Sequence, residues 1–224
     1  MNLKMKIHMN KKIKVLVTAG PTWVPIDRVR VITSVFSGNT GLRIARYIKD
    51  QGHDVTLFMG PGRPEYIDGD SDIKLKQFWY YEDLKKLLHE NVSDDYDVII
   101  HSSAVSDYTP SDVYDGKIPS LNDGLTINLK ETEKLVDWIR TAAPAAFLVK
   151  FKLQVGLSPE QLYDIAIKSL KHSNANLIVA NDLDEMDGEN HVAYIIEPDG
   201  NSKRLLTKEG ICISLYEKII EGIK

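Results

Sequence analysis

The chain has 224 residues, which is enough for one large α/β domain or two small ones. Its net charge of −4 argues against a surface that serves mainly nucleic acid or anionic lipid. The one cysteine, Cys212, excludes a disulfide within the chain and a metal cluster built from cysteines.

The N-terminal segment does not have the pattern of a secretory signal peptide. Met1 to Lys12 is basic and lacks the apolar stretch of a secretory signal. Elsewhere, no apolar run approaches the ~18 residues that span a membrane. We therefore expect residues 1–11 to form a flexible leader and the protein to be cytoplasmic.

The first expected strand, KVLV at 14–17, leads into a loop with two small-residue turns, at 18–22 and 37–41. Such turns let a backbone approach an anion, and the N–H groups of a first helical turn favour negative charge. Arg28 and Arg30 lie between the turns, so the unit predicts a ligand with more than one anionic group. Neither GxGxxG nor a P-loop pattern is present, and the alternative is that the glycines only form tight turns.

The rest of the chain alternates between short apolar runs and helical periodicity. We expect strands at 53–59, 73–78, 96–100, 147–151 and 177–180, and helices at 42–51, 81–90, 131–140 and 158–171. This alternation predicts a doubly wound, mostly parallel, Rossmann-like sheet.

Two segments depart from that alternation. Residues 109–123 are rich in Pro, Gly, Ser and Asp and are followed by a short expected strand at 125–129, which together suggest a long excursion loop or flap at about 109–129. The chain then ends in a hairpin, 191–196 with 203–206, and an amphipathic helix. We expect residues 12–224 to form a single α/β domain.

Small and polar residues follow most of the expected strands, where an open α/β sheet binds its ligands. These strand ends are Thr18-Ala19-Gly20, Gly60-Pro61-Gly62, His101-Ser102-Ser103, Phe151-Lys152-Leu153 and Asn181-Asp182. Three polar side chains at or near these strand ends have two interpretations. Lys152 binds an anion or extends into solvent, His101 is a base or a satisfied buried histidine, and Asp107 contacts a ligand or caps a turn.

Seven short motifs occur in a fixed order: Thr18-Ala19-Gly20-Pro21-Thr22, Pro25-Ile26-Asp27, Val29-Arg30, Ser37-Gly38 with Gly41, Ala104-Val105-Ser106-Asp107-Tyr108, Phe151-Lys152-Leu153 and Val179-Ala180-Asn181-Asp182. As an ordered set they resemble phosphopantothenate–cysteine ligase, or phosphopantothenoylcysteine synthetase, of coenzyme A biosynthesis. The resemblance covers the chain from about Lys12 to its end. Residues 151–153 resemble the stand-alone form rather than the form fused behind a flavin-dependent decarboxylase.

The resemblance implies a two-step reaction. CTP or ATP activates the carboxylate of 4′-phosphopantothenate as an acyl-nucleotidyl intermediate and releases pyrophosphate. The amine of cysteine then attacks to form an amide. The resemblance also implies Mg²⁺ with the nucleotide, and a homodimer.

The same resemblance implies the residues of the site. It implies catalytic roles for Arg30, for residue 34 and for a helix lysine, which is Lys168 or, in an alternative alignment, Lys171. It implies nucleotide or substrate binding by Gly20, Ser37, Gly38, Gly41, Ala104, Asp107, Lys117, Phe151, Lys152, Leu153 and Asn181. It implies no particular metal ligand.

One position departs from the family pattern. Where the family has an asparagine that holds the activated carboxyl group, this chain has Ser34. A hydroxyl offers one donor on a shorter stem, whereas an amide offers two donors and an acceptor. The first alternative to the ligase is therefore a nucleotide- or flavin-binding module, or a paralogue without full activity. A nicotinamide-dependent reductase is a further alternative, although the glycine pattern for such a cofactor is missing.

Overall fold

The computed structural model describes residues 12–62, 72–120, 124–187 and 190–223. Six parallel strands form most of a nine-stranded sheet, in the spatial order β5-β4-β1-β6-β9-β10 with β5 at one edge. They are β1 (Lys14–Ala19), β4 (Asp54–Met59), β5 (Lys74–Gln77), β6 (Val98–His101), β9 (Phe147–Gln154) and β10 (Leu177–Asp182). The leader expected at residues 1–11 lies outside the described residues.

The sheet continues beyond β10 with antiparallel strands. β12 (Asn190–Ile196) pairs with β10, β13 (Ser202–Thr207) and the short β11 (Met186–Asp187). The doubly wound, mostly parallel α/β sheet and its C-terminal hairpin are therefore confirmed. The strand order changes direction between β1 and β6, and ligands of such sheets bind where this happens.

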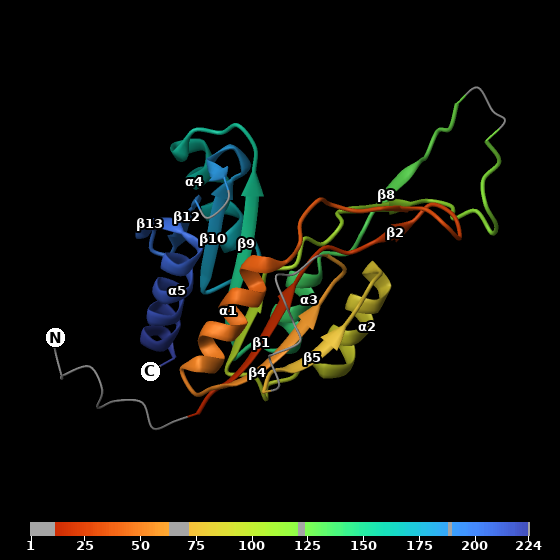
Figure 1. The fold of residues 1–224 in the computed structure, drawn as a ribbon. Coiled ribbons are helices and arrows are strands. Elements are labelled where there is room, and N and C mark those ends of the chain that lie inside the picture. The colour runs from red at the N-terminus through yellow and green to blue at the C-terminus, as the bar shows by residue number, and fades with distance from the viewer. Residues whose placement is uncertain (1–11, 63–71, 121–123, 188–189, 224) are drawn as a thin grey trace.

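Helices cover both faces of the sheet (Figure 1). α1 (Asn39–Asp50) and α5 (Lys208–Gly222) lie on one face. α2 (Tyr81–Asn91), α3 (Leu135–Ala142) and α4 (Pro159–His172) lie on the other. In β1, Val15 and Val17 pack in the α1/α5 layer, whereas Leu16 packs with α2 and α3. Because both faces are buried, the central strands are almost continuously apolar.

α1 and α5 pack directly against each other although they are far apart in the chain. The rings of Tyr47 and Tyr216 meet edge to face at 5.8 Å. Tyr216 also shares a 3.0 Å hydrogen bond with the ring of His53, at the start of β4. The α1/α5 layer is thus closed by side chains from the first and the last helix.

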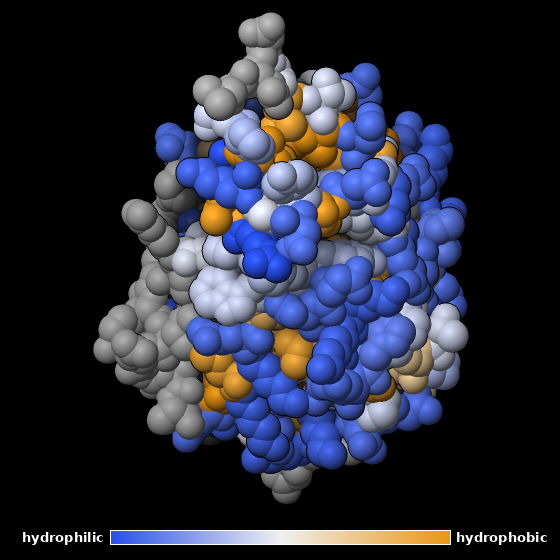
Figure 2. Space-filling model, turned by 90° about the vertical axis from the view of Figure 1, so that its right-hand side faces the viewer, coloured by the Kyte–Doolittle hydropathy of each residue, from blue (hydrophilic) through white to orange (hydrophobic). Residues whose placement is uncertain are grey.

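The described part of the excursion loop forms an arm with the loop after β1. We define the arm as the described residues of 23–32 and 108–131. It contains two short antiparallel pairs: β2 (Val24–Pro25) with β3 (Val31–Ile32), and β7 (Tyr108–Pro110) with β8 (Leu129–Glu131). It projects from the sheet (Figure 1). Figure 2, viewed from the arm side, shows apolar areas set among hydrophilic residues.

Asp27 joins the two halves of the arm. Its buried carboxylate accepts hydrogen bonds from the backbone N–H groups of Val29 and Arg30 at 2.8 Å and of Ile118 at 3.0 Å. The Arg30 guanidinium completes the set at 2.8 Å. Burial alone raises the pKa of Asp27, but the backbone donors and the Arg30 charge outweigh it and leave that pKa lowered.

Most expected elements are confirmed within a few residues, but the prediction for residues 125–140 is wrong in detail. The strand expected at 125–129 is replaced by β8, which begins at Leu129 and pairs with β7. The helix expected from Glu131 begins instead at Leu135, because Glu131 belongs to that strand. β2, β3, β7 and β11 were not expected from the sequence.

Candidate active site

A cavity of about 770 Å³ lies along the carboxyl ends of β1, β6, β9 and β10. It includes the point where the strand order changes direction. Its wall is made by the small-residue turn after β1, the small-residue turn that leads into α1, the loop after β6, the start of α3, and the ends of β9 and β10.

Backbone hydrogen bonds join the loops that follow β1 and β6 and so shape the floor of the cavity. Ala104 N–H donates to the Gly20 carbonyl at 3.0 Å, and Thr22 N–H donates to the Ala104 carbonyl at 3.2 Å. The hydroxyl of Ser102 donates to the Thr18 carbonyl at 2.6 Å. These contacts hold Gly20 and Ala104, both expected at the site, side by side.

The N-terminus of α1 opens onto the same cavity. Gly38 is its N-cap residue, with φ of 82°, and no side chain caps the turn. A Cβ atom on Gly41 would overlap Ser102 Oγ and would lie 2.6 Å from the Cβ of Ala19. Glycine at both positions therefore lets α1 begin directly against the loops after β1 and β6, with its positive dipole end at the cavity.

Two buried basic side chains lie on the α3/α4 side of the cavity. His101 Nδ1 is 2.9 Å from Thr18 Oγ1, and burial together with the Lys150 charge lowers the pKa of His101 to about 4. Lys150 donates to the Ser169 carbonyl at 3.2 Å and to Ser173 Oγ at 3.0 Å, and burial lowers its pKa. His101 is thus a neutral, satisfied histidine at neutral pH.

The exposed mouth of the cavity carries further charge. Lys134 pairs with Asp107 at 2.6 Å. Lys152 follows Lys150 on the same side of β9, and no hydrogen bond or ion pair joins its ammonium to another described residue. An ammonium group in this position can bind a ligand anion.

Ser34 presents an unsatisfied hydroxyl at the cavity. Its Oγ atom is buried and has no hydrogen-bond partner among the described residues, and the residue lines the cavity. Ser103 also lines the cavity, and its Oγ atom is likewise buried without a hydrogen-bond partner among the described residues. Buried hydroxyls without a protein partner are rare, and a bound polar group can satisfy them.

The structure brings most of the expected residues together. Those that line the cavity are Gly20, Ser34, Ser37, Gly38, Gly41, Ala104, Asp107, Phe151, Lys152, Leu153 and Asn181.

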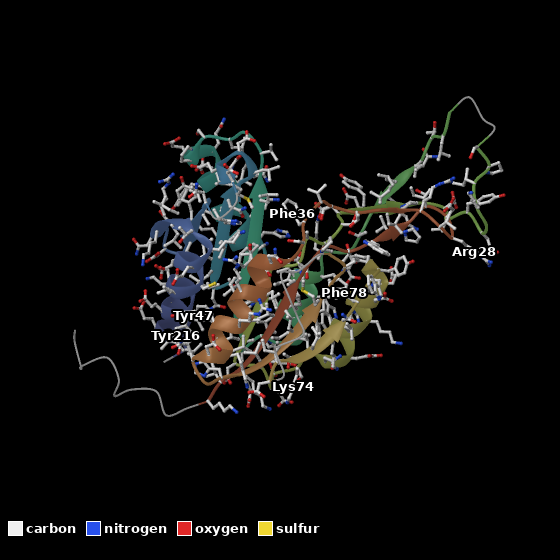
Figure 3. The ribbon with its side chains drawn as sticks, in the orientation of Figure 1. Arg28, Phe36, Tyr47, Lys74, Phe78 and Tyr216 are labelled. Carbon is white, nitrogen blue, oxygen red and sulfur yellow. The ribbon has the colours of Figure 1, made fainter. Side chains whose placement is uncertain are left out.

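Four expected residues do not line the cavity. Arg30 lies in the arm with Asp27, and Lys117 is exposed in the arm loop. Lys168 and Lys171 are exposed on α4. Arg28 also departs from its expected place beside the two turns, because it pairs with Asp115 near the tip of the arm, far from the cavity residue Phe36 (Figure 3).

Sequence reasoning missed five basic residues of the cavity: Lys134, Lys150, His172, His191 and Lys208. One signal was available, because Lys150 and Lys152 alternate with apolar residues at the end of a buried strand and so share a face.

Among the described residues, no group of three or more His, Cys, Asp or Glu side chains could hold a metal ion. Asp182, at the end of β10, stabilises local structure. Both carboxylate oxygens of Asp182 accept backbone hydrogen bonds, from Gly156 at 3.0 Å and from Leu157 at 2.9 Å. No helix in the described part of the chain is long and apolar enough to cross a membrane.

The chain matches the protein family described as the DNA/pantothenate metabolism flavoprotein C-terminal domain over residues 10–223. It belongs to this family. The family is that of phosphopantothenoylcysteine synthetase, so the resemblance found in the sequence is confirmed.

Members of the phosphopantothenoylcysteine synthetase family from archaea are similar over most of this chain. The coenzyme A biosynthesis bifunctional protein CoaBC of Thermococcus kodakarensis is 32% identical over 209 residues, which are 92% of this chain and 50% of that protein. CoaBC of Methanocaldococcus jannaschii is 30% identical over 215 residues, 94% of this chain and 51% of that protein. The chain therefore spans about half the length of these curated relatives.

A solved structure shares the fold. The DNA/pantothenate metabolism flavoprotein of Streptococcus pneumoniae has a TM-score of 0.84 and 33% sequence identity, covering 93% of this chain and 99% of that one. A Cab2 variant in complex with phosphopantothenate-cysteine has a TM-score of 0.70 at 18% identity, covering 94% of this chain and 88% of that one, which shows the fold alone.

Proposed function

We propose that the chain is a ligase of coenzyme A biosynthesis that joins 4′-phosphopantothenate to cysteine, with CTP or ATP as co-substrate. The observation that carries the proposal is the cavity at the strand-order reversal, because eleven residues that the family resemblance implies for the site line it together. Family membership and the CoaBC relatives support the same reaction.

The first step needs a carboxylate to attack a phosphorus atom of a nucleoside triphosphate. The nucleotide brings several negative charges, and the α1 N-terminus and Lys152 supply positive ones at the cavity. We propose that they orient the triphosphate, so that pyrophosphate leaves and an acyl nucleotidylate forms. Ser34 is proposed to hold the activated carboxyl group through its unsatisfied hydroxyl.

In the second step, the amine of cysteine attacks the acyl carbon. The carbon–nitrogen bond forms as the nucleoside monophosphate leaves, and the amine loses a proton. The neutral His101 is buried and bonded to Thr18, so we assign it a structural part and no proton transfer.

Mg²⁺ is proposed to enter with the nucleotide. The described side chains offer no three-ligand cluster for it, so they do not form a protein-built metal site. Mg²⁺ is commonly held by substrate phosphates with only one or two carboxylates. No step above depends on its position.

The arm supports a proposal of assembly. It exposes apolar side chains, with Val29 at 64%, Val113 at 50% and Tyr114 at 51% exposure. We propose that the chain forms a homodimer and that the flap region at about 109–129 takes part in covering a site. This would give Arg30 and Lys117 a place near bound substrate. Because its substrates are metabolites, we propose a cytoplasmic location.

The experiment that tests the ligase compares product formation with simple binding. Wild-type protein is mixed with CTP or ATP, Mg²⁺, phosphopantothenate and cysteine, and released pyrophosphate is measured. We expect release that depends on phosphopantothenate. Thermal stabilisation by NAD or flavin, with none by CTP or ATP and no pyrophosphate, would instead support a binding module or a reductase.

Lys152→Ala is expected to weaken nucleotide binding or turnover without unfolding the protein. Loss of one charge-assisted contact costs about 2 kcal/mol, which is about 30-fold in affinity or rate. The control is Lys74→Ala, because Lys74 is exposed at the end of the sheet opposite the cavity (Figure 3). Titration calorimetry with CTP measures the difference. Equal affinities in the two variants would mean that Lys152 only extends into solvent.

Ser34→Asn is expected to raise product formation on the order of tenfold, because an amide adds a second donor on a longer stem at the activated carboxyl group. Single-turnover product formation by wild type and variant is the measurement. A water molecule bound by serine would make the gain small. Robust turnover by wild type with a loss in the variant would show that Ser34 is a working replacement for the family asparagine.

A further inference from the structure

The cavity has a second end, to whose residues neither of the two proposed reaction steps gives a role. It lies on the α1/α5 face of the sheet and is lined by Asn181, Met186, His191 and Lys208. We call these four residues the β10–β12 end. The motif residue Asn181 is the one that the sequence singled out.

His191 is the unusual residue of this end. It is 5% exposed, lies opposite Met186 in the β11–β12 pair, and lines the cavity. Its Nδ1 atom is buried and has no hydrogen-bond partner among the described residues. A buried ring nitrogen without a partner destabilises a fold, so its retention at a cavity wall suggests that a bound group satisfies it.

The charges around His191 favour an anion. Lys208 lines this end and is near enough to lower the pKa of His191, together with burial, to about 4. His191 is therefore neutral at neutral pH and can donate one hydrogen bond. The acidic residues that line the cavity, Asp107, Glu133 and Asp137, all belong to the β7 and α3 side.

Two helices of the α1/α5 face begin at the carboxyl ends of the parallel strands, where the cavity lies. α1 starts after Gly38, and α5 starts at Lys208 after its N-cap residue Thr207. The N-terminus of a helix carries a partial positive charge, and both helices lie on the face where the β10–β12 end opens.

We propose that the β10–β12 end binds an anionic oxygen group of a substrate, phosphoryl or carboxylate, with His191 Nδ1–H as hydrogen-bond donor and Lys208 as the opposite charge. The inference rests on the proposed function, since that function supplies two sources of such a group. They are the phosphate of phosphopantothenate and the polyphosphate of the nucleotide.

The test uses His191→Leu, which removes the ring nitrogens and puts an apolar side chain of similar size in their place. We expect an equal or higher melting temperature, because an unsatisfied buried polar atom is removed. We also expect about tenfold weaker binding of one anionic substrate. Calorimetry with phosphopantothenate and, separately, with CTP identifies which source binds there, and cysteine binding serves as an internal reference.

A second variant keeps the test decisive if His191→Leu fails to fold. Lys208→Gln should weaken binding of the same ligand by a similar factor and should leave the affinity for the other ligand unchanged. Its control is Lys203→Gln, which removes a charge from an exposed residue of β13 that pairs with Glu217. Unchanged affinity for both ligands in folded His191→Leu, or in Lys208→Gln, overturns the inference.

These binding measurements need no turnover, so the two proposals fail separately. Wild-type protein that makes product, with variants that bind like wild type, would retain the ligase and remove the β10–β12 anion site. Wild-type protein that binds neither substrate and makes no product would overturn the ligase itself, and with it the inference.

Discussion

Gly38→Ala is expected to cost about 3 kcal/mol of stability and to abolish tight nucleotide binding. The residue has φ of 82°, which costs an L-residue about 1–2 kcal/mol. Its new Cβ would also lie 2.6 Å from Gly20 N and 2.7 Å from Gly20 Cα. The Gly20 backbone is held by its bond from Ala104, so the overlap moves the α1 N-terminus and adds a further cost.

Gly52→Ala is the matched control for this change. Gly52 follows the C-cap of the same helix with φ of 94°, but a Cβ there has nothing within 4 Å. The Gly52→Ala variant should therefore lose only about 1 kcal/mol of stability, the cost of a positive φ for an L-residue, and should bind nucleotide like wild type. Chemical denaturation and calorimetry with CTP measure both quantities. If the two variants are equally stable and bind equally well, close approach of Gly38 to Gly20 is unimportant.

Asp27→Asn is expected to separate the two halves of the arm. Oδ1 accepts from Val29 and Arg30 N–H groups, and an amide oxygen can replace it. Oδ2 accepts from Ile118 N–H and from the Arg30 guanidinium, where an amide NH₂ would face two donors. The local opening equilibrium at Ile118 should therefore rise about tenfold or more. Hydrogen exchange of that amide is the measurement.

The control is Asp115→Asn. The side chains of the Arg28–Asp115 pair are 72% and 84% exposed, so this pair should contribute little to the stability of the arm. Acid should reproduce the Asp27→Asn effect in wild type. The pKa of Asp27 is lowered from its ordinary value of 3.8, so its contribution is present above about pH 4 and is lost as the pH falls through the lower value. Slow Ile118 exchange in Asp27→Asn would contradict a joining role for Asp27.

The central fold could be predicted because local pattern and tertiary structure agree there. Runs such as KVLV at 14–17 are apolar throughout since both faces of their strands are buried. Ser158 and Pro159 mark the start of α4 by side-chain capping, which depends only on neighbouring residues. Fold class and helix starts therefore follow from short windows of sequence.

The arm could not be predicted in this way. Its strands are two or three residues long and depend on contacts such as Asp27 with Ile118, which lie 91 positions apart. A strand was expected at 125–129, but Leu125 and Leu129 are 55% and 47% exposed, so no packed face supports it. His191 was missed for a related reason, because a strand pattern does not reveal that one ring nitrogen lacks a partner.

The pairing of α1 with α5 has a consequence for how the chain folds. The contacts of Tyr47 and His53 with Tyr216 join residues separated by more than half of the sequence. Contacts so distant carry a large loop-closure cost and form late. Until α5 docks, the apolar sheet face beneath it is open to water and to other chains. Folding intermediates of this protein should therefore bind hydrophobic dyes and depend on chaperones until that last helix is in place.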